Sequence, residues 1–207
     1  MKSWVSHTLA VTRRRRLVQL ALALAMLGIL LWGLPGRRSD EDGGHHRGHG
    51  KRGADVFERA GVTELKEGQR SPGFRLARRG GGEATLDAWS GKLVVLNFWA
   101  TWCTPCTSEM PTLEALWRDY RNRGLVVIGV SVDRGAPAAL IDPYVRNLAL
   151  TFPILLDPDS KTAGAWRING LPSTFVVRPG GEVAGVAVGA REWNSAEMKA
   201  LLETLLP

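Results

Sequence analysis

Residues 93–106 read Leu-Val-Val-Leu-Asn-Phe-Trp-Ala-Thr-Trp-Cys-Thr-Pro-Cys, and this stretch decides the fold of the chain. Its first seven residues are a nearly continuous apolar run, which is typical of a strand buried on both faces of a sheet. Two cysteines follow, and apolar residues at helical spacing then extend from Met110 to Tyr120. Gly124 ends that helix, and residues 125–132 form a second apolar run. Strand, helix and strand in this order predict a right-handed parallel crossover.

The segments on either side of this unit predict a larger mixed sheet. Further strands are predicted over residues 74–77, 84–86, 152–156, 173–177 and 183–188. Further helices are predicted over residues 138–150, 160–168 and a C-terminal segment capped by Asn194. The order predicts an α/β fold, in which helices sandwich a mixed central sheet. It carries an N-terminal β-hairpin and an inserted αβ segment.

The positive charge of the chain is concentrated near its N-terminus. Residues 1–53 hold ten of the 27 Lys and Arg residues but three of the 20 Asp and Glu residues, so residues 54–207 carry 17 of each. The net charge of +7 therefore does not favour nucleic-acid binding by the folded part. The length of 207 residues suits one good core, and we expect residues 54–207 to form one monomeric domain.

The N-terminal part is expected to be a membrane anchor. Residues 1–16 form a basic flank that contains Arg13–Arg16, and residues 17–34 form an apolar run of 18 residues, near the lower limit for a spanning helix. The positive-inside rule keeps the flank in the cytoplasm and exports the chain after the run. Residues 35–53 are rich in Gly, charge and His, which predicts a flexible linker. We therefore expect a single-pass protein of the cell membrane, with its domain extracytoplasmic on the periplasmic side.

Other interpretations of this part stay open. A cleaved signal peptide would need a small-x-small cleavage site after the apolar run, and residues 33–36 match that pattern poorly. A twin-arginine export signal at Arg14–Arg15 fits loosely. A buried cytoplasmic helix is the one alternative without export. The linker histidines, His45, His46 and His49, could bind a metal but lack a fourth ligand. We expect neither a metal nor a cofactor.

The chain has two cysteines, Cys103 and Cys106. Two are too few for a disulfide framework or a zinc site, so a redox pair is favoured. Cys103 stands where a helix begins, and the free N–H groups and partial positive charge of a helix N-terminus stabilise a thiolate and lower its pKa. We expect Cys103 to attack a substrate disulfide, and Cys106 to resolve the mixed disulfide one turn later.

Residues 98–106 resemble the active-site signature of the thioredoxin superfamily, and the resemblance covers residues 70–207. Pro111 stands five residues after the second cysteine, where thioredoxins kink this helix. Residues 171–175 look like the segment that holds a cis-proline opposite the cysteines. The resemblance therefore implies a thioredoxin-like fold.

Three residues around the cysteine pair are expected to bind substrate. A cis bond between Leu171 and Pro172 turns the Leu171 backbone outward, so that it can pair with an extended substrate as an added strand. Trp102 is expected to shield the cysteines and to contact substrate, with a plain core position as the alternative.

Within the superfamily the chain is most similar to the TlpA/ResA/CcmG group of anchored, extracytoplasmic thioredoxins. The similarity rests on residues 106–111, Cys-Thr-Ser-Glu-Met-Pro, and on the long segment 134–159. It implies reduction of exported proteins with cysteine pairs, such as apocytochrome c or copper-site cysteines, and a membrane thiol reductase as electron donor. Thr104–Pro105 contains no His, which favours a reducing potential of roughly −200 to −300 mV.

One position departs from the superfamily pattern. Many thioredoxins bury an Asp six residues before the first cysteine, where it accepts a proton from the second, but this chain has Asn97 there. Glu109, three residues past Cys106 on the same helix face, is the expected replacement. A half-buried carboxylate near thiols has a raised pKa and can act as acid or base. A solvated helix residue is the alternative for Glu109.

These features predict an extracytoplasmic thiol-disulfide oxidoreductase, and other classes fit less well. A peroxiredoxin-like peroxidase is expected to have Thr at position 100, which is Ala. A copper chaperone is expected to have C-x-x-x-C and a distant His, and residues 54–207 contain no His. A non-catalytic binding module or a static disulfide does not need this pair in this setting.

Overall fold

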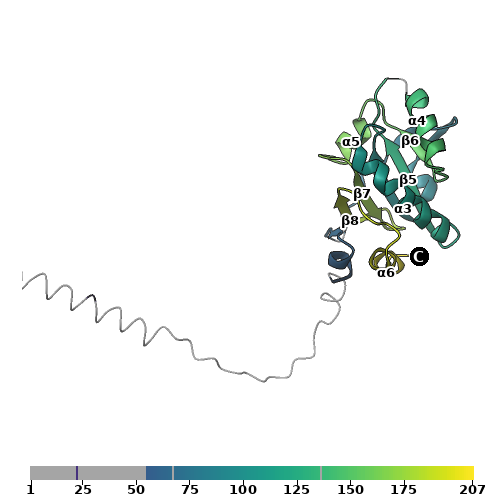
Figure 1. Ribbon diagram of the computed structural model, residues 1–207. Coiled ribbons are helices and arrows are strands. Elements are labelled where there is room, and N and C mark those ends of the chain that lie inside the picture. Colours follow the sequence, from purple (N-terminus) through teal and green to yellow (C-terminus); the bar gives the residue numbers. More distant parts are fainter. Residues whose placement is uncertain (1–21, 23–54, 67, 136) are drawn as a thin grey trace, which may run out of the picture. The chain divides into compact units, whose positions relative to one another are not determined.

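The computed structural model describes residues 22, 55–66, 68–135 and 137–207. The chain divides into two units, Met1–His46 and Arg47–Pro207, and nearly all described residues belong to the second (Figure 1). The predicted basic flank, anchor and linker lie outside the described residues, apart from Leu22. Within the described part of the chain, we find no helix with the length and apolar character needed to cross a membrane.

The described part of the second unit contains a mixed sheet in the order β1-β8-β7-β4-β5-β6-β2-β3. The strands are β1 (Thr63–Glu64), β2 (Arg75–Arg78), β3 (Glu83–Thr85), β4 (Leu93–Trp99), β5 (Leu125–Ser131), β6 (Ile154–Leu156), β7 (Ser173–Val177) and β8 (Val183–Val188). The helices are η1 (Leu86–Trp89), α3 (Thr104–Tyr120), α4 (Pro137–Asn147), α5 (Lys161–Ala165) and α6 (Ala196–Glu203), and residues 55–59 are helical as well. Helices α3, α4 and α6 pack on one face of the sheet, and α5 and η1 on the other (Figure 1).

Strands β4 and β5 lie at the centre of the sheet and position the cysteine pair. They pair in parallel along seven residues, and every residue of both is buried. Alternate β4 side chains face opposite layers, so Val95 and Trp99 pack on the α3 side and Phe98 packs on the α5 side. Asn97 has the same parity as Val95 and Trp99 and therefore faces α3. The chain leaves β4 at Trp99 and enters α3 at Thr104, after four intervening residues.

The predicted α/β thioredoxin-like fold is confirmed in its main elements. The parallel β4–α3–β5 crossover, the antiparallel β2–β3 hairpin and the antiparallel β7–β8 pair are all present. The insertion supplies α4 and β6, and β6 joins the sheet beside β5. The assignment of Asn194 as the last helix cap is wrong. Ser195 is the cap, because its extended backbone lets its side chain accept a hydrogen bond from the Met198 N–H at 3.2 Å.

Candidate active site

The cysteine pair lies where α3 begins, at the end of β4. Cys103 is the N-cap residue of α3, and its Sγ accepts a hydrogen bond from the Cys106 N–H at 3.2 Å. Pro105 stands in the first helical turn, where its missing N–H costs nothing. The two cysteines form a disulfide, with their Cα atoms 5.2 Å apart. In the reduced protein, the same backbone donor and the helix N-terminus would stabilise a Cys103 thiolate.

The two cysteine residues differ slightly in exposure. Cys103 retains 5% exposure, whereas Cys106 is completely buried beneath it. Trp102 is 70% exposed, so its alternative as a core residue is wrong. Trp99 and Phe98, in contrast, are fully buried. The pair therefore has one member that keeps slight exposure, next to an exposed aromatic side chain, and one that is fully buried.

The Leu171–Pro172 peptide bond is cis, as the sequence predicts. Pro172 immediately precedes β7, whose first residue, Ser173, pairs with Phe98 near the end of β4. This register brings the cis-proline to the edge of the sheet where the cysteine turn lies. The Pro172 carbonyl accepts a hydrogen bond from the Gly189 N–H at 2.8 Å, but the half-buried Leu171 makes no backbone hydrogen bond to any described residue.

Glu109 lies on α3 one turn after Cys106 and is 1% exposed. Its position corrects two expectations, because the side chain is neither solvated nor half-buried. Oε1 accepts a hydrogen bond from Asn97 Nδ2 at 2.7 Å, and Oε2 accepts from the Arg191 N–H at 3.0 Å and Trp193 Nε1 at 3.1 Å. Burial raises the pKa of the Glu109 carboxyl above its ordinary value, although the hydrogen bonds from Trp193, Arg191 and Asn97 oppose the shift.

Two parts of this environment could not be found from the sequence. Arg191 and Trp193 lie more than 80 positions from Glu109, and the segment after β8 brings them to α3. Asp133 braces the cysteine turn, because its carboxylate accepts hydrogen bonds from the Thr101 N–H and Oγ1 and from Ser131 Oγ. Asp133 stands just after β5, and its place at the end of a central parallel strand is the one available signal.

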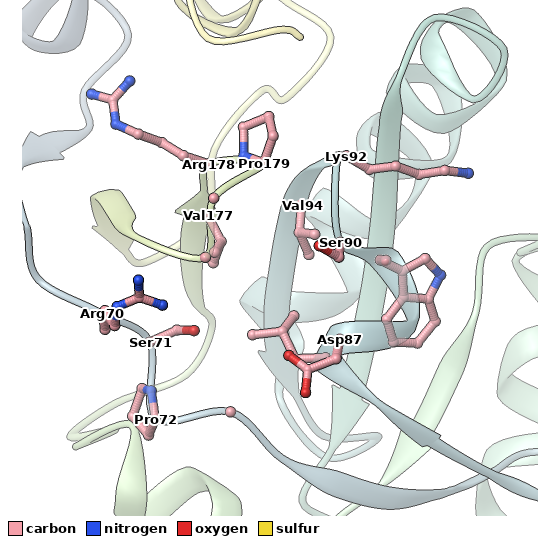
Figure 2. A pocket seen from close by; sticks show the side chains of 15 residues that line it. Arg70, Ser71, Pro72, Asp87, Ser90, Lys92, Val94, Val177, Arg178 and Pro179 are labelled. Carbon is pink, nitrogen blue, oxygen red and sulfur yellow. The ribbon is translucent and has the colours of Figure 1, made fainter.

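A separate pocket lies at the opposite end of β4, away from the cysteines. It has a volume of about 320 Å³ and is lined by Asp87, Lys92 and Arg178, among others (Figure 2). The Lys92 and Arg178 side chains turn outward in this view and do not converge on one point. Among the residues that the structure describes, no cluster of His, Cys, Asp and Glu could hold a metal ion.

Fold and site together define a thioredoxin-fold thiol-disulfide oxidoreductase. The chain belongs to the AhpC/TSA family, whose model matches residues 68–186. It is 34% identical over 145 residues to the thiol-disulfide oxidoreductase ResA of Geobacillus kaustophilus, covering 70% of this chain and 81% of the relative. It is 32% identical over 130 residues to ResA of Bacillus subtilis, covering 63% and 72%.

A solved structure shows the same likeness. It is a thiol:disulfide interchange protein of the thioredoxin family from Chlorobium tepidum, with a TM-score of 0.61 and 25% identity, and the match covers 69% of this chain and 99% of that one. The similarity to the ResA group that residues 106–111 indicate is thus confirmed, as is the enzyme class.

Proposed function

We propose that the protein reduces disulfides of exported proteins that carry paired cysteines, from an anchored position outside the cytoplasm. The observation that carries this proposal is the asymmetry of the pair: Cys103 keeps slight exposure beside the exposed Trp102, and Cys106 is fully buried one turn before Glu109. A two-step disulfide exchange needs two thiols. One attacks the partner disulfide, and the other is shielded from the partner and resolves the mixed disulfide. Apocytochrome c and copper-site proteins are the substrate candidates that the resemblance implies.

The exchange starts from the reduced pair. The Cys103 thiolate attacks one sulfur of the substrate disulfide, and the other substrate sulfur leaves as a thiolate. Cys106 then loses its proton to the Glu109 carboxylate and attacks Cys103 Sγ. The second substrate sulfur leaves, and the Cys103–Cys106 disulfide forms, as it stands in this structure. Two electrons pass to the substrate, and a membrane thiol reductase is the proposed source of the electrons that restore the pair.

Substrate is proposed to lie along the cis-proline segment. An extended peptide that pairs with the unpartnered Leu171 backbone would run past Pro172 and place its cysteine over Cys103. Trp102 would cover the peptide from the other side of the cysteine turn. The domain needs no second copy in this arrangement, so it is proposed to act as a monomer.

Export is proposed from the N-terminal sequence, in which the basic flank at residues 1–16 precedes the apolar run at residues 17–34. Fusion at residue 207 to a reporter that is active only after export tests this location. An active fusion is expected. A reporter that works only inside the cytoplasm would place the domain on the wrong side for exported substrates.

The proton-transfer step is tested with Glu109→Gln, which keeps the size of the side chain but cannot take a proton. Reduction of a test disulfide is expected to slow, with an altered pH profile from about pH 5 to about pH 9. The Asp119→Asn variant is the matched control, because Asp119 is an exposed acid of the same helix. Equal rates for Glu109→Gln and the unchanged protein across this range would remove Glu109 from the mechanism.

A further inference from the structure

Only the nitrogen of the Asn97 side-chain amide makes hydrogen bonds to the described residues. Its Nδ2 donates to Glu109 Oε1 at 2.7 Å and to Thr174 Oγ1 at 2.8 Å. Its Oδ1 is buried and has no hydrogen-bond partner among the described residues. Asn97 is completely buried and Thr174 is 1% exposed, so the arrangement lies in the core. The two ends of the Asn97 amide are therefore unequal in this structure, because the nitrogen has two partners and the oxygen has none among the described residues.

The hydrogen bonds of Glu109 show which of its oxygens would carry a proton. Oε2 already accepts from the Arg191 backbone N–H and from Trp193 Nε1, and neither donor can turn into an acceptor. A proton on Oε2 would displace one of them. Oε1 has a single donor, Asn97 Nδ2. The proton of a neutral Glu109 therefore belongs on Oε1, where it meets the Asn97 amide.

We propose that Asn97 is a proton-dependent positioning residue, whose amide rotates when Glu109 takes up a proton. With Glu109 ionised, Nδ2 donates to the carboxylate, as in this structure. With Glu109 neutral, the amide turns over, so that Oδ1 accepts the hydrogen bond from the protonated Oε1 and Nδ2 moves to the place that Oδ1 leaves. The Thr174 hydroxyl fits both states, because it accepts from Nδ2 in the first and can donate to Oδ1 in the second. This role rests on the proposed function, in which Glu109 takes the Cys106 proton.

Few other charged groups bear on this site. Cys106 lies on the same helix, and in the disulfide form it does not titrate. Tyr144 of α4 interacts electrostatically with Glu109. The Arg191 guanidinium, which donates to the carbonyls of Gly61, Gly189 and Ala190, lowers the Glu109 pKa through its positive charge. Asn97 of β4 contacts Glu109, and Thr174 of β7 contacts Asn97. Neither side chain carries a charge.

The rotation is tested by NMR on the full chain in its disulfide form, where the result does not depend on catalysis. The Glu109 carboxyl carbon and the Asn97 side-chain amide are followed as the pH is lowered. The cross-peak between the Asn97 Nδ2 protons and the Thr174 side chain is expected above the Glu109 midpoint and lost below it. Glu109→Gln should hold the amide in one orientation at every pH. A cross-peak that persists while Glu109 titrates overturns the rotation.

Variants test the same role through the Glu109 midpoint. Asn97→Ala removes a donor to the carboxylate, so the midpoint is expected to rise by about 1 to 2 pH units. Thr151→Val is the matched control, because it removes a hydroxyl donor from Glu114, the other buried carboxylate of α3. It should leave the Glu109 midpoint in place. An unchanged Glu109 midpoint in Asn97→Ala, with the fold intact, contradicts the positioning role of Asn97. A raised midpoint in Asn97→Ala, together with an unchanged reduction rate in Glu109→Gln, would contradict only the proposed proton transfer.

Discussion

Removal of the Glu109 side chain should destabilise the domain far more than its replacement by Gln. Glu109→Ala removes the acceptor of three N–H groups: one N–H of Asn97 Nδ2, whose other N–H keeps Thr174 Oγ1, the part-buried Arg191 N–H, and the buried Trp193 Nε1. Each such group costs about 1–3 kcal/mol, so the loss is expected to be about 3–5 kcal/mol, allowing for water that enters the space. In Glu109→Gln, the carbonyl can accept from Arg191 and Trp193, and the new amide can donate to the unused Asn97 Oδ1. Its change in stability should stay within about 1 kcal/mol.

The free energy of unfolding of each variant can be measured by urea denaturation of the disulfide form at neutral pH. Asp119→Asn serves as the control for loss of a carboxylate from α3, and it should change stability by about 0.5 kcal/mol or less, because its ion pair with Lys199 is at the surface. Similar stabilities of Glu109→Ala and Glu109→Gln would show that the buried hydrogen bonds to Glu109 do not hold α3 to the segment after β8.

Three further predictions concern pH, reactivity and substrate contact. Burial raises the folded-state pKa of Glu109 above 4.5, so the folded protein binds more protons than the unfolded protein in this pH range. Its free energy of unfolding should therefore fall as the pH rises from about 4.5 through the raised pKa. Urea titrations should show this fall in the unchanged protein and its absence in Glu109→Gln. In the reduced protein, Cys103 should alkylate with an apparent pKa below about 8.5 and Cys106 should react poorly, whereas equal rates would contradict the helix N-terminus argument. Trp102→Ala should slow reduction of a protein disulfide while changing stability by about 0.5 kcal/mol or less, because the side chain is exposed; an unchanged rate would return Trp102 to a passive position.

The fold could be predicted largely from local patterns, because its central elements are strongly specified. The apolar runs at residues 93–99 and 125–132 are typical of strands buried on both faces, and the helical spacing between them predicts the parallel crossover that the structure has. The ends of a helix are harder to predict where two neighbouring residues can both serve as its N-cap. Asn194 and Ser195 are both good caps, and the choice depends on backbone angles that the sequence does not show.

The site could be predicted in its reactive atoms but not in its surroundings. Cys103, Cys106 and Glu109 stand within seven positions on one helix, so their spacing alone brings them together. The burial of Glu109 depends on Trp193 and on the Arg191 backbone, which only the tertiary fold brings to α3. Such long-range contacts leave no periodic pattern in the sequence. The sequence therefore predicts a half-buried Glu109, whereas the structure encloses it fully.

The attack of Cys103 on a partner disulfide is tested most directly by trapping its intermediate in cells. Cys106→Ala removes the resolving thiol and keeps the attacking one, so partners should stay covalently attached. Adducts of high mass are expected on a non-reducing gel, should collapse on addition of reductant, and should be absent from Cys103→Ala and from the double variant. Adducts that persist without Cys103 would reverse the two roles. No adducts from Cys106→Ala, with the protein exported and folded, would contradict the account and favour a static disulfide.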